Sequence, residues 1–490
     1  MPLLSSILMV PTITLLAILL VPGRAVQVIR WLCALCALTT AFLSVQLWMG
    51  YDPGAGGIQF VEKIPWVSGM GISYHVGVDG FGIVLVMLNS IVFLTGVLTM
   101  WDLQTRVKEF FAFMVLLVIG VYGVFVSQDM FFFFFFYEIA VVPMYPLIII
   151  WGSGNKEYAA MKLMLFLLAG SALLFPGLLA IYHHSGLHTF DLVLLSQHTF
   201  DPEFQIFVYP FIYIGFGVLA GMFPFHGWSP TGHVAAPSAV SMLHAGVLMK
   251  LGAFGVLSVG IRLLPEGAIY WAPTFCTFAA VGIVYGAFVA IRQTDFKFVI
   301  GFSSVSHMGI VLLGLNLAVL GKAGSDALNG AVFQMFAHGI MTALFFSTVG
   351  FIYDRAHSKT IADFGGLGSQ MPRAVSIFVV AGLCGAGLPG LASFWAELLV
   401  FLAAIKTYPI IGVAIIIGLV LTAVYILRVF TIAFFGPPND RWDKLREVDL
   451  SGYQLMPRAI LVAVLVYFGF VPRAMLDIIN STTTAFLGKF

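Results

Sequence analysis

Three ionisable residues stand in the middle of long apolar segments of this sequence. Glu138 follows six phenylalanines and a tyrosine, Lys250 has apolar flanks on both sides, and Glu397 lies within Ser393–Val400. A charge at the centre of a bilayer costs at least ~2.5–3.5 kcal/mol on insertion scales, so it normally faces a wet cavity or a partner. Snorkelling accounts for a lysine only near a helix end. We therefore expect all three residues to serve an ion path rather than a purely structural role.

Three histidines accompany these residues in apolar surroundings. His244 precedes Lys250 by six residues, about 120° around a helix, so direct contact between them would require a water molecule or a second helix. His307 and His338 each lie among small residues that allow close helix packing. Histidine titrates near neutrality and suits proton relay, although a structural hydrogen bond to a neighbouring helix is the alternative for each. Carboxylate, lysine and histidine in series favour protons over Na⁺, because hard cations prefer oxygen ligands.

Other polar residues lie near the expected helix ends. Asp295 and Lys297 are typical of an interfacial helix start rather than an ion site. His226 and His233, on either side of Pro230, either line the mouth of a path or are satisfied loop residues. A zinc site is not expected there, because further ligands are missing nearby.

The composition places these residues in a membrane protein. The chain of 490 residues is 60% hydrophobic and only 9% charged, against roughly 25% charged in an average soluble domain. Apolar runs of about 20 residues recur, and each can cross a ~30 Å hydrocarbon core. We predict an all-α polytopic fold with about fourteen transmembrane helices, at residues 3–22, 27–48, 80–100, 109–127, 129–151, 160–183, 204–225, 236–263, 270–292, 299–320, 326–352, 372–406, 409–436 and 456–474.

Two further features concern the loops. Residues 51–75 form a Gly/Pro-containing loop, and the alternation near residues 57–61 indicates a small hairpin outside the membrane. Most lysines and arginines of the short loops follow odd-numbered helices, so we expect these loops to face the cytoplasm.

Two segments interrupt the helical pattern at matching places. Met222–Pro230 follows a helix of ordinary length, and Gly385–Gly390 divides a long apolar stretch. Proline removes a helical donor and glycine loosens the backbone, so both segments are predicted to break a helix. Paired breaks about five helices apart are typical of two inverted five-helix repeats with ion sites near the midplane. The expected divisions are N-terminal helices with an external loop, a first repeat, a second inverted repeat and a C-terminal helix with its tail, at residues 1–108, 109–263, 264–436 and 437–490.

The sequence lacks the motifs of redox and nucleotide chemistry. It contains no phosphate-binding loop, nucleophile elbow or haem attachment motif. The four cysteines lie in apolar segments without an iron–sulfur spacing, and Cys33 and Cys36 are expected to pack as small hydrophobes. We expect no cofactor in this chain, and its driving energy should come from an ion gradient or from partner subunits.

The sequence resembles the antiporter-like subunits of respiratory NADH:quinone oxidoreductase (complex I), especially subunit M, the counterpart of mitochondrial ND four. The resemblance covers nearly the whole chain. It implies fourteen helices with inverted repeats, and proton translocation driven by quinone reduction elsewhere in the complex. It also implies flavin, iron–sulfur clusters and quinone in partner subunits, neighbouring membrane-arm and antiporter-like subunits, and the bacterial cytoplasmic (inner) membrane. The matching segments are Glu138–Pro143, Phe223–Trp228, His233–Pro237, Leu248–Gly255, Gln293–Lys297, Ser303–Gly309, Phe336–Gly339 and Pro389–Glu397.

By this resemblance, Glu138 corresponds to the carboxylate of the fifth helix, Lys250 to the central lysine of the eighth, and Glu397 to the terminal carboxylate of the twelfth. His307 and His338 match the histidines between them. The resemblance therefore implies that these five residues form the proton path, and we add His244 to it as our own hypothesis.

One position departs from the family pattern. Seven residues before His226, the family usually carries a lysine that pairs with the fifth-helix glutamate, and this chain has Leu219. His244 stands where subunit M usually has an apolar residue. We hypothesise that His244 partly replaces the missing lysine.

Three functional classes remain open at this stage. The chain is a proton-pumping subunit of a quinone oxidoreductase, a subunit of a multi-chain cation/proton antiporter or membrane-bound hydrogenase, or a scaffold that lost pumping with the lysine at position 219. The retained buried charges argue against the scaffold, because an idle charge in the membrane is costly.

Overall fold

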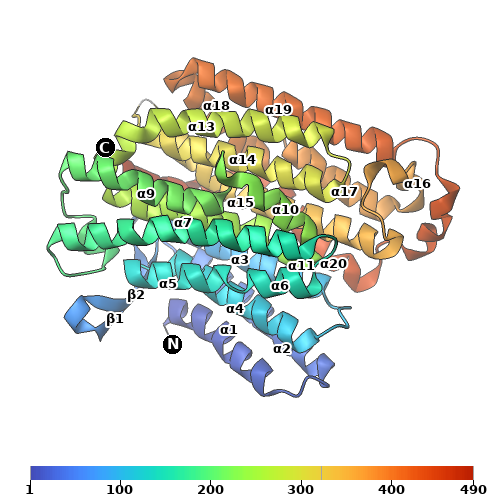
Figure 1. Ribbon diagram of the computed structural model, residues 1–490, viewed down its shortest axis with the longest axis horizontal. Helices are drawn as coiled ribbons and strands as arrows, with labels where there is room; N and C mark the ends of the chain where they lie inside the picture. Colours follow the sequence, from blue (N-terminus) through green and yellow to red (C-terminus); the bar gives the residue numbers. More distant parts are fainter. Residues whose placement is uncertain (1, 322, 489–490) are drawn as a thin grey trace.

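The computed structural model describes residues 2–321 and 323–488, and it is a bundle of long helices running in nearly the same direction (Figure 1). Thirteen helical segments of this described part are long and apolar enough to cross a membrane. They are α1 (Leu3–Leu20), α2 (Val26–Gly50), α3 (Gly80–Thr99), α4 (Val107–Val126), α5 (Met130–Val141) with α6 (Met144–Trp151), α7 (Lys156–Ser185), α9 (Pro202–Ala220) with α10 (Trp228–Ala235), α11 (Ser238–Leu243) with its continuation to Ile261, α13 (Pro265–Arg292), α14 (Phe296–Ala318), α15 (Gly324–Ala356), α19 (Pro409–Val429) with η6 (Phe430–Phe434), and η8 (Gly452–Gln454) with α20 (Met456–Phe470).

The fourteenth expected span is a broken helix. It consists of α17 (Pro372–Gly385) and α18 (Ala392–Thr407), which are separated by a segment whose Gly387 and Gly390 have φ angles of 70° and 93°. Only glycine adopts this left-handed region without strain. Thirteen of the fourteen predicted spans thus match apolar segments of membrane-spanning length, and the remaining one, at 372–406, is this broken helix. The span expected at 204–225 extends to Ala235.

The other predicted break is also present. Helix α9 ends before Gly221, whose φ is 75°, and the chain re-enters through η2 (Phe225–Gly227) and α10. In each half, the broken helix packs against the long helix that precedes it in its unit: α9 and α10 on α7, and α17 and α18 on α15. This is the matching arrangement that the paired breaks predicted.

The helix that carries Lys250 is irregular. It begins as α11, passes through the π-helical turn η3 (His244–Leu248), continues as α12 (Met249–Gly255) and ends in a second π-helical turn, η4 (Val256–Ile261). The sequence predicted an ordinary helix at residues 236–263. All of its residues in the membrane are buried in the protein. Wide π turns occur frequently at functional sites, and here they lie on both sides of the lysine.

The two ends of the bundle differ. An antiparallel hairpin of β1 (Gln59–Val67) and β2 (Ile72–Val78) lies at one end, on the left of Figure 1, and confirms the predicted hairpin. We call this end, with the loop between α7 and α9, the hairpin face. The tail expected after α20 is a further helix, α21 (Arg473–Leu487), which packs on α3 and α15. The remaining short elements are η1 (Ser68–Met70), α8 (Leu192–Leu195), η5 (Ile361–Asp363), α16 (Leu367–Gln370) and η7 (Asp440–Val448).

Candidate functional site

Lys250 is fully buried in α12, where its ammonium contacts a neighbouring helix. Its Nζ donates a hydrogen bond to the carbonyl of Ala245 at 2.5 Å and lies 2.7 Å from Nδ1 of His338. The two helices can approach closely because residue 339 is a glycine. A Cβ at this position would lie only 2.5 Å from the carbonyl oxygen of Gly246. An ammonium group can only donate, so Nδ1 of His338 is the acceptor when the lysine is charged.

His338 continues the contact toward α14. Its ring stacks on that of His307, with centroids 5.4 Å apart and planes inclined by 22°. Nδ1 of His307 lies 2.8 Å from the carbonyl oxygen of Ser303, and Nε2 lies 3.1 Å from that of Gly385. Both ring nitrogens of His307 therefore face oxygen acceptors, a pattern that the doubly protonated imidazolium satisfies.

Glu397 completes this line of side chains. Its Oε1 lies 3.4 Å from Nε2 of His307 and accepts a hydrogen bond from Nε2 of Gln334 at 3.1 Å. Its Oε2 has no hydrogen-bond partner among the described residues. The break between α17 and α18 creates the site, because it frees the Gly385 carbonyl and places Glu397 in the second turn of α18. We call Lys250, His338, His307 and Glu397 the lysine–glutamate line.

Glu138 lies apart from this line. Its Oε1 accepts a hydrogen bond from Oγ of Ser171 in α7 at 2.5 Å. Within the described part of the chain, no basic group lies within 4.0 Å of its carboxylate. Leu219, at the position of the family lysine, is fully buried. The structure thus gives Glu138 a serine partner in place of a cation.

His244 contacts α10 rather than Glu138. Its ring lies 5.1 Å from that of Trp228 and 4.3 Å from that of His233. His233 is fully buried, and its Nε2 lies 2.9 Å from Oγ of Ser229. Three ring nitrogens of this pair, Nδ1 of His233 and both of His244, have no partner in residues 2–321 and 323–488.

His233 is the functional candidate that sequence reasoning placed too loosely. It was expected at a path mouth or in a satisfied loop, but α10 folds into the bundle and carries it beside the lysine helix. Its position in the sequence could have indicated this, because His233 comes just after the break at Met222–Pro230 and is followed by an apolar segment. His226, by contrast, packs near the rings of Phe223 and Tyr285 and joins neither cluster.

Residues 293–297 contain the predicted helix start. Asp295 has the expected role there, whereas Lys297 makes a further contact inside the protein. Asp295 caps α14 by accepting a hydrogen bond from the backbone N–H of Lys297 at 2.7 Å. Lys297 itself is 3% exposed within the protein, and its Nζ donates to the carbonyl of Ala236 at 2.9 Å. A cation at the carboxyl end of α10 stabilises the last, unpaired carbonyls of that broken helix.

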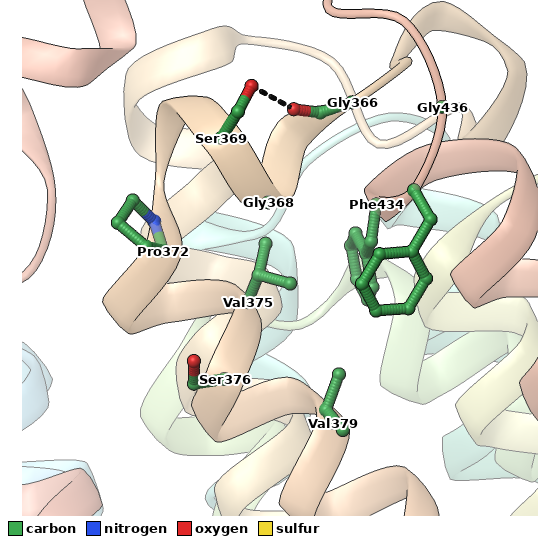
Figure 2. A pocket seen from close by; sticks show the side chains of 10 residues that line it. Gly366, Gly368, Ser369, Pro372, Val375, Ser376, Val379, Phe434 and Gly436 are labelled. Atoms are coloured by element: carbon green, nitrogen blue, oxygen red, sulfur yellow. Dashed lines mark hydrogen bonds between the residues drawn. The ribbon is translucent and has the colours of Figure 1, made fainter.

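One surface hollow lies away from these residues. It measures about 450 Å³ and lies where α16 and α17 meet the end of η6 (Figure 2). Its lining contains no ionisable side chain, so it offers no chemistry of its own. The described residues also hold no group of three or more His, Cys, Asp or Glu side chains that could bind a metal ion.

A second charged cluster lies at the hairpin face. Asp191 is 2% exposed; its Oδ2 accepts a hydrogen bond from Nζ of Lys63 at 2.6 Å and lies 3.0 Å from Nδ1 of His75. Burial alone would raise the pKa of Asp191, but the hydrogen bonds from His75 and Lys63 hold it well below its usual range. Because Lys63 and His75 belong to β1 and β2, this cluster fastens the hairpin to the loop between α7 and α9.

The chain is similar to known proteins. The membrane domain of the NADH:quinone oxidoreductase/Mrp antiporter family matches residues 127–422. An NAD(P)H-quinone oxidoreductase chain 4 of Picosynechococcus sp. is 35% identical, over 94% of this chain and 83% of its own length. The NADH-quinone oxidoreductase subunit M of Rickettsia bellii is 32% identical, over 100% of this chain and 99% of its own length.

Solved structures give the same result. A chain of respiratory complex I from Thermus thermophilus superposes with a TM-score of 0.90 at 25% identity, over 100% of this chain and 99% of that one. A chain of the Mrp complex from Dietzia sp. has a TM-score of 0.87 at 19% identity, over 100% and 98%, and therefore shares the fold. With the family match covering more than half of its length and two relatives above 30% identity, the chain belongs to the NADH:quinone oxidoreductase/Mrp antiporter membrane-subunit family.

Proposed function

We propose that this chain is the chain 4 or subunit M component of a quinone oxidoreductase and moves protons through its lysine–glutamate line. The observation that carries the proposal is the unbroken series of buried ionisable contacts from Lys250 to Glu397. Hydrogen-bonded groups of this kind transfer protons, whereas unrelated buried charges would each cost on the order of several kcal/mol of desolvation. The chain supplies the path, and quinone reduction in partner subunits supplies the energy.

The geometry allows a sequence of proton transfers. The Lys250 ammonium gives a proton to Nδ1 of His338, which becomes an imidazolium as the lysine becomes a neutral amine. Nε2 of His338 has no protein partner in the described chain, so it passes its proton through a bridging water molecule toward His307. His307 has by then given its Nε2 proton to Glu397, its neighbour at 3.4 Å, so that its neutral ring can accept the incoming proton. Each transfer moves one proton and leaves the donor ready to be refilled.

Glu138 and His244 are proposed as the groups that load this line. Glu138 does not contact His244. His244 therefore cannot replace the missing lysine as a direct partner of the Glu138 carboxylate. The neighbouring pair of His233 and His244, whose ring planes are inclined by 59°, supports a different form of the same hypothesis. Its unpartnered nitrogens hold or release protons beside the lysine helix, where a second titratable group changes the charge around Lys250.

The setting of the chain is inferred from its relatives. They are named as subunits of NADH- or NAD(P)H-quinone oxidoreductases. We propose that flavin, iron–sulfur clusters and quinone reside in partner subunits, that neighbouring membrane-arm and antiporter-like subunits flank this chain, and that the membrane is the bacterial cytoplasmic membrane. The same names favour an oxidoreductase over the multi-chain antiporter, because the likeness to the Mrp chain at 19% identity concerns the fold.

The experiment that tests this proposal is Lys250→Ala in the whole complex reconstituted into vesicles. The variant should lower the number of protons moved per quinone reduced by roughly tenfold, because it removes the central donor. Lys406→Ala is the matched control, since Lys406 forms an exposed ion pair with Asp326. If Lys250→Ala moved protons as well as Lys406→Ala, the chain would be a scaffold, and the proposed path would be refuted.

A further inference from the structure

Helix α9 carries a buried polar stripe that the lysine–glutamate line does not use. Gln205, Tyr209 and Tyr213 recur at every fourth residue, so they lie on one side of the helix. All are buried, and Nδ2 of Asn316 in α14 donates a hydrogen bond to the Tyr213 hydroxyl at 2.7 Å. In Figure 1, α9 runs between α7 and α13 from the hairpin face toward the centre of the bundle. A polar stripe at this depth calls for a function, because apolar side chains would pack there at lower cost.

The stripe begins at a hollow in the hairpin face. This hollow measures about 340 Å³, and its lining includes Gln205, Arg262, Glu266 and His198. Gln205 belongs to both features: its Nε2 donates to the Phe200 carbonyl at 2.7 Å, and its Oε1 accepts from the Glu266 backbone N–H at 2.8 Å. The outermost member of the stripe is therefore anchored at a charged, polar cavity.

Two polar atoms within the stripe lack partners. The rings of Tyr209 and Tyr213 lie 5.7 Å apart, yet the Tyr209 hydroxyl and Oδ1 of Asn316 have no hydrogen bond to any described residue. Leaving such a group unsatisfied destabilises the fold, because the group gives up the hydrogen bonds that water offers it in the unfolded chain. Buried water molecules typically make roughly two to four hydrogen bonds to groups of this kind. The tyrosine hydroxyls and the asparagine amide together provide that number.

We propose that Gln205, Tyr209, Tyr213 and Asn316 bind a chain of water molecules that conducts protons between the hairpin-face hollow and the interior beside the lysine helix. Each hydroxyl accepts one hydrogen bond and donates another. A proton that enters at one end thus releases a different proton at the other, and no side chain keeps a charge. The inference rests on the proton transport proposed above and assigns that transport a connection to one membrane surface.

Phe216 closes the inner end of this stripe. It follows Tyr213 by three residues, and its ring lies so close to α12 that a Cβ on Gly255 would be 2.4 Å from it. The same ring packs against Tyr137 with centroids 5.6 Å apart. Phe216 therefore lies between the inner end of the stripe and α12, the helix that carries Lys250.

Two substitutions at Tyr209 distinguish conduction from packing. Tyr209→Phe keeps the ring and removes the hydroxyl, whereas Tyr209→Ser keeps a hydroxyl and leaves space for water. We expect Tyr209→Phe in the reconstituted complex to lower the protons moved per quinone reduced at least roughly twofold, and Tyr209→Ser to keep a clearly higher yield. A packing role predicts the reverse order. Equal yields in the two variants, or a lower yield for Tyr209→Ser, would overturn the proposal.

Two further variants provide the controls. Tyr122→Phe removes another fully buried hydroxyl, which is 2.7 Å from Ser90 and outside the stripe, and it should leave the yield unchanged. Lys250→Ala reports on the underlying proposal. If Lys250→Ala lowers the yield and Tyr209→Phe does not, the water chain is refuted alone; if Lys250→Ala has no effect, the proposed proton path itself fails.

Discussion

The two broken helices hold their carboxylates in different ways. In the second half, the break between α17 and α18 brings Glu397 against His307 and Gln334, so the acid is joined to the lysine helix through α14 and α15. In the first half, the break between α9 and α10 turns inward to carry His233 against His244. Glu138 stays on α5 with Ser171 as its hydrogen-bond donor.

This contrast shows that two halves with similar broken helices need not place the same partners around their carboxylates. Both halves contain a broken helix, but the side chains that surround the carboxylate differ between the two halves. In the second half a histidine makes that link. In the first half Leu219 occupies the position of the family lysine, and the buried titratable pair consists of His233 in α10 and His244 in η3.

The largest effect is expected from cutting the second-half line at its centre. His338→Leu removes the only side chain among the described residues that is hydrogen-bonded to the Lys250 ammonium, and leaves that charge with one carbonyl. Protons moved per quinone reduced should fall by roughly tenfold or more, as in the loss of a general acid–base group. His226→Leu is the control, because His226 lies in neither cluster. A wild-type yield for His338→Leu would show that protons reach Glu397 by another route.

A smaller effect is expected at the two carboxylates, and their ranking tests the comparison directly. Glu397→Gln breaks a continuous line, whereas Glu138→Gln removes a group held by a single serine. Proton yield should fall less in Glu138→Gln than in Glu397→Gln. We expect the barrier to proton transfer to differ by about 1 kcal/mol between the two variants, which corresponds to a roughly fivefold difference in transfer rate. Equal losses would mean that Glu138 is coupled to the line through groups other than direct contacts.

Leu219→Lys sharpens the same comparison by restoring the family residue. If the pair of His233 and His244 has taken over the lysine's role, His244→Leu alone should lower proton yield about twofold, equal to roughly 0.4 kcal/mol. Adding Leu219→Lys to His244→Leu should then recover the yield. Failure of the double variant to recover, with the complex still assembled, would separate the role of His244 from that of the missing lysine.

Much of this arrangement could be predicted from the sequence. The spans follow from apolar length, and the breaks follow from Gly385–Gly390 and Met222–Pro230, because proline and glycine act locally. Lys250 and Glu397 were identifiable because an isolated charge in an apolar membrane segment is costly and is therefore rarely idle. The order of contacts along the lysine–glutamate line, however, depends on how α14 and α15 cross α12, which no local pattern records.

Other features depended on tertiary packing. The π turns η3 and η4 add a residue to a helical turn, and their sequences contain the same small and apolar residues as ordinary membrane helices. The contact of His233 with His244 requires α10 to fold back into the bundle, and the pattern around Pro230 was compatible with an exposed loop. Lys297 was expected at an interface for a similar reason: its partner, the Ala236 carbonyl, lies 61 residues away in sequence.

The smallest effect on proton transport is expected at the hairpin-face cluster, which is structural. Asp191→Asn removes the charge that Lys63 and His75 share, and should destabilise the docked hairpin by about 1–3 kcal/mol. Proton yield per quinone reduced should remain unchanged. Limited proteolysis of residues 52–72 in the intact complex would measure the loss as faster cleavage, and Asp52→Asn, at an exposed turn, provides the control.

The pH dependence of this effect has a definite sign. The pKa of folded Asp191 is held well below its usual range by His75 and Lys63, so its stabilising contribution is complete above the unfolded value of about 3.9 and declines only as the pH falls through the folded value. The difference in hairpin protection between the native chain and Asp191→Asn should therefore be constant from about pH 5 to 8 and narrow below about pH 4. A difference that instead shrank between about pH 6 and 8 would contradict the role assigned to the Asp191 carboxylate.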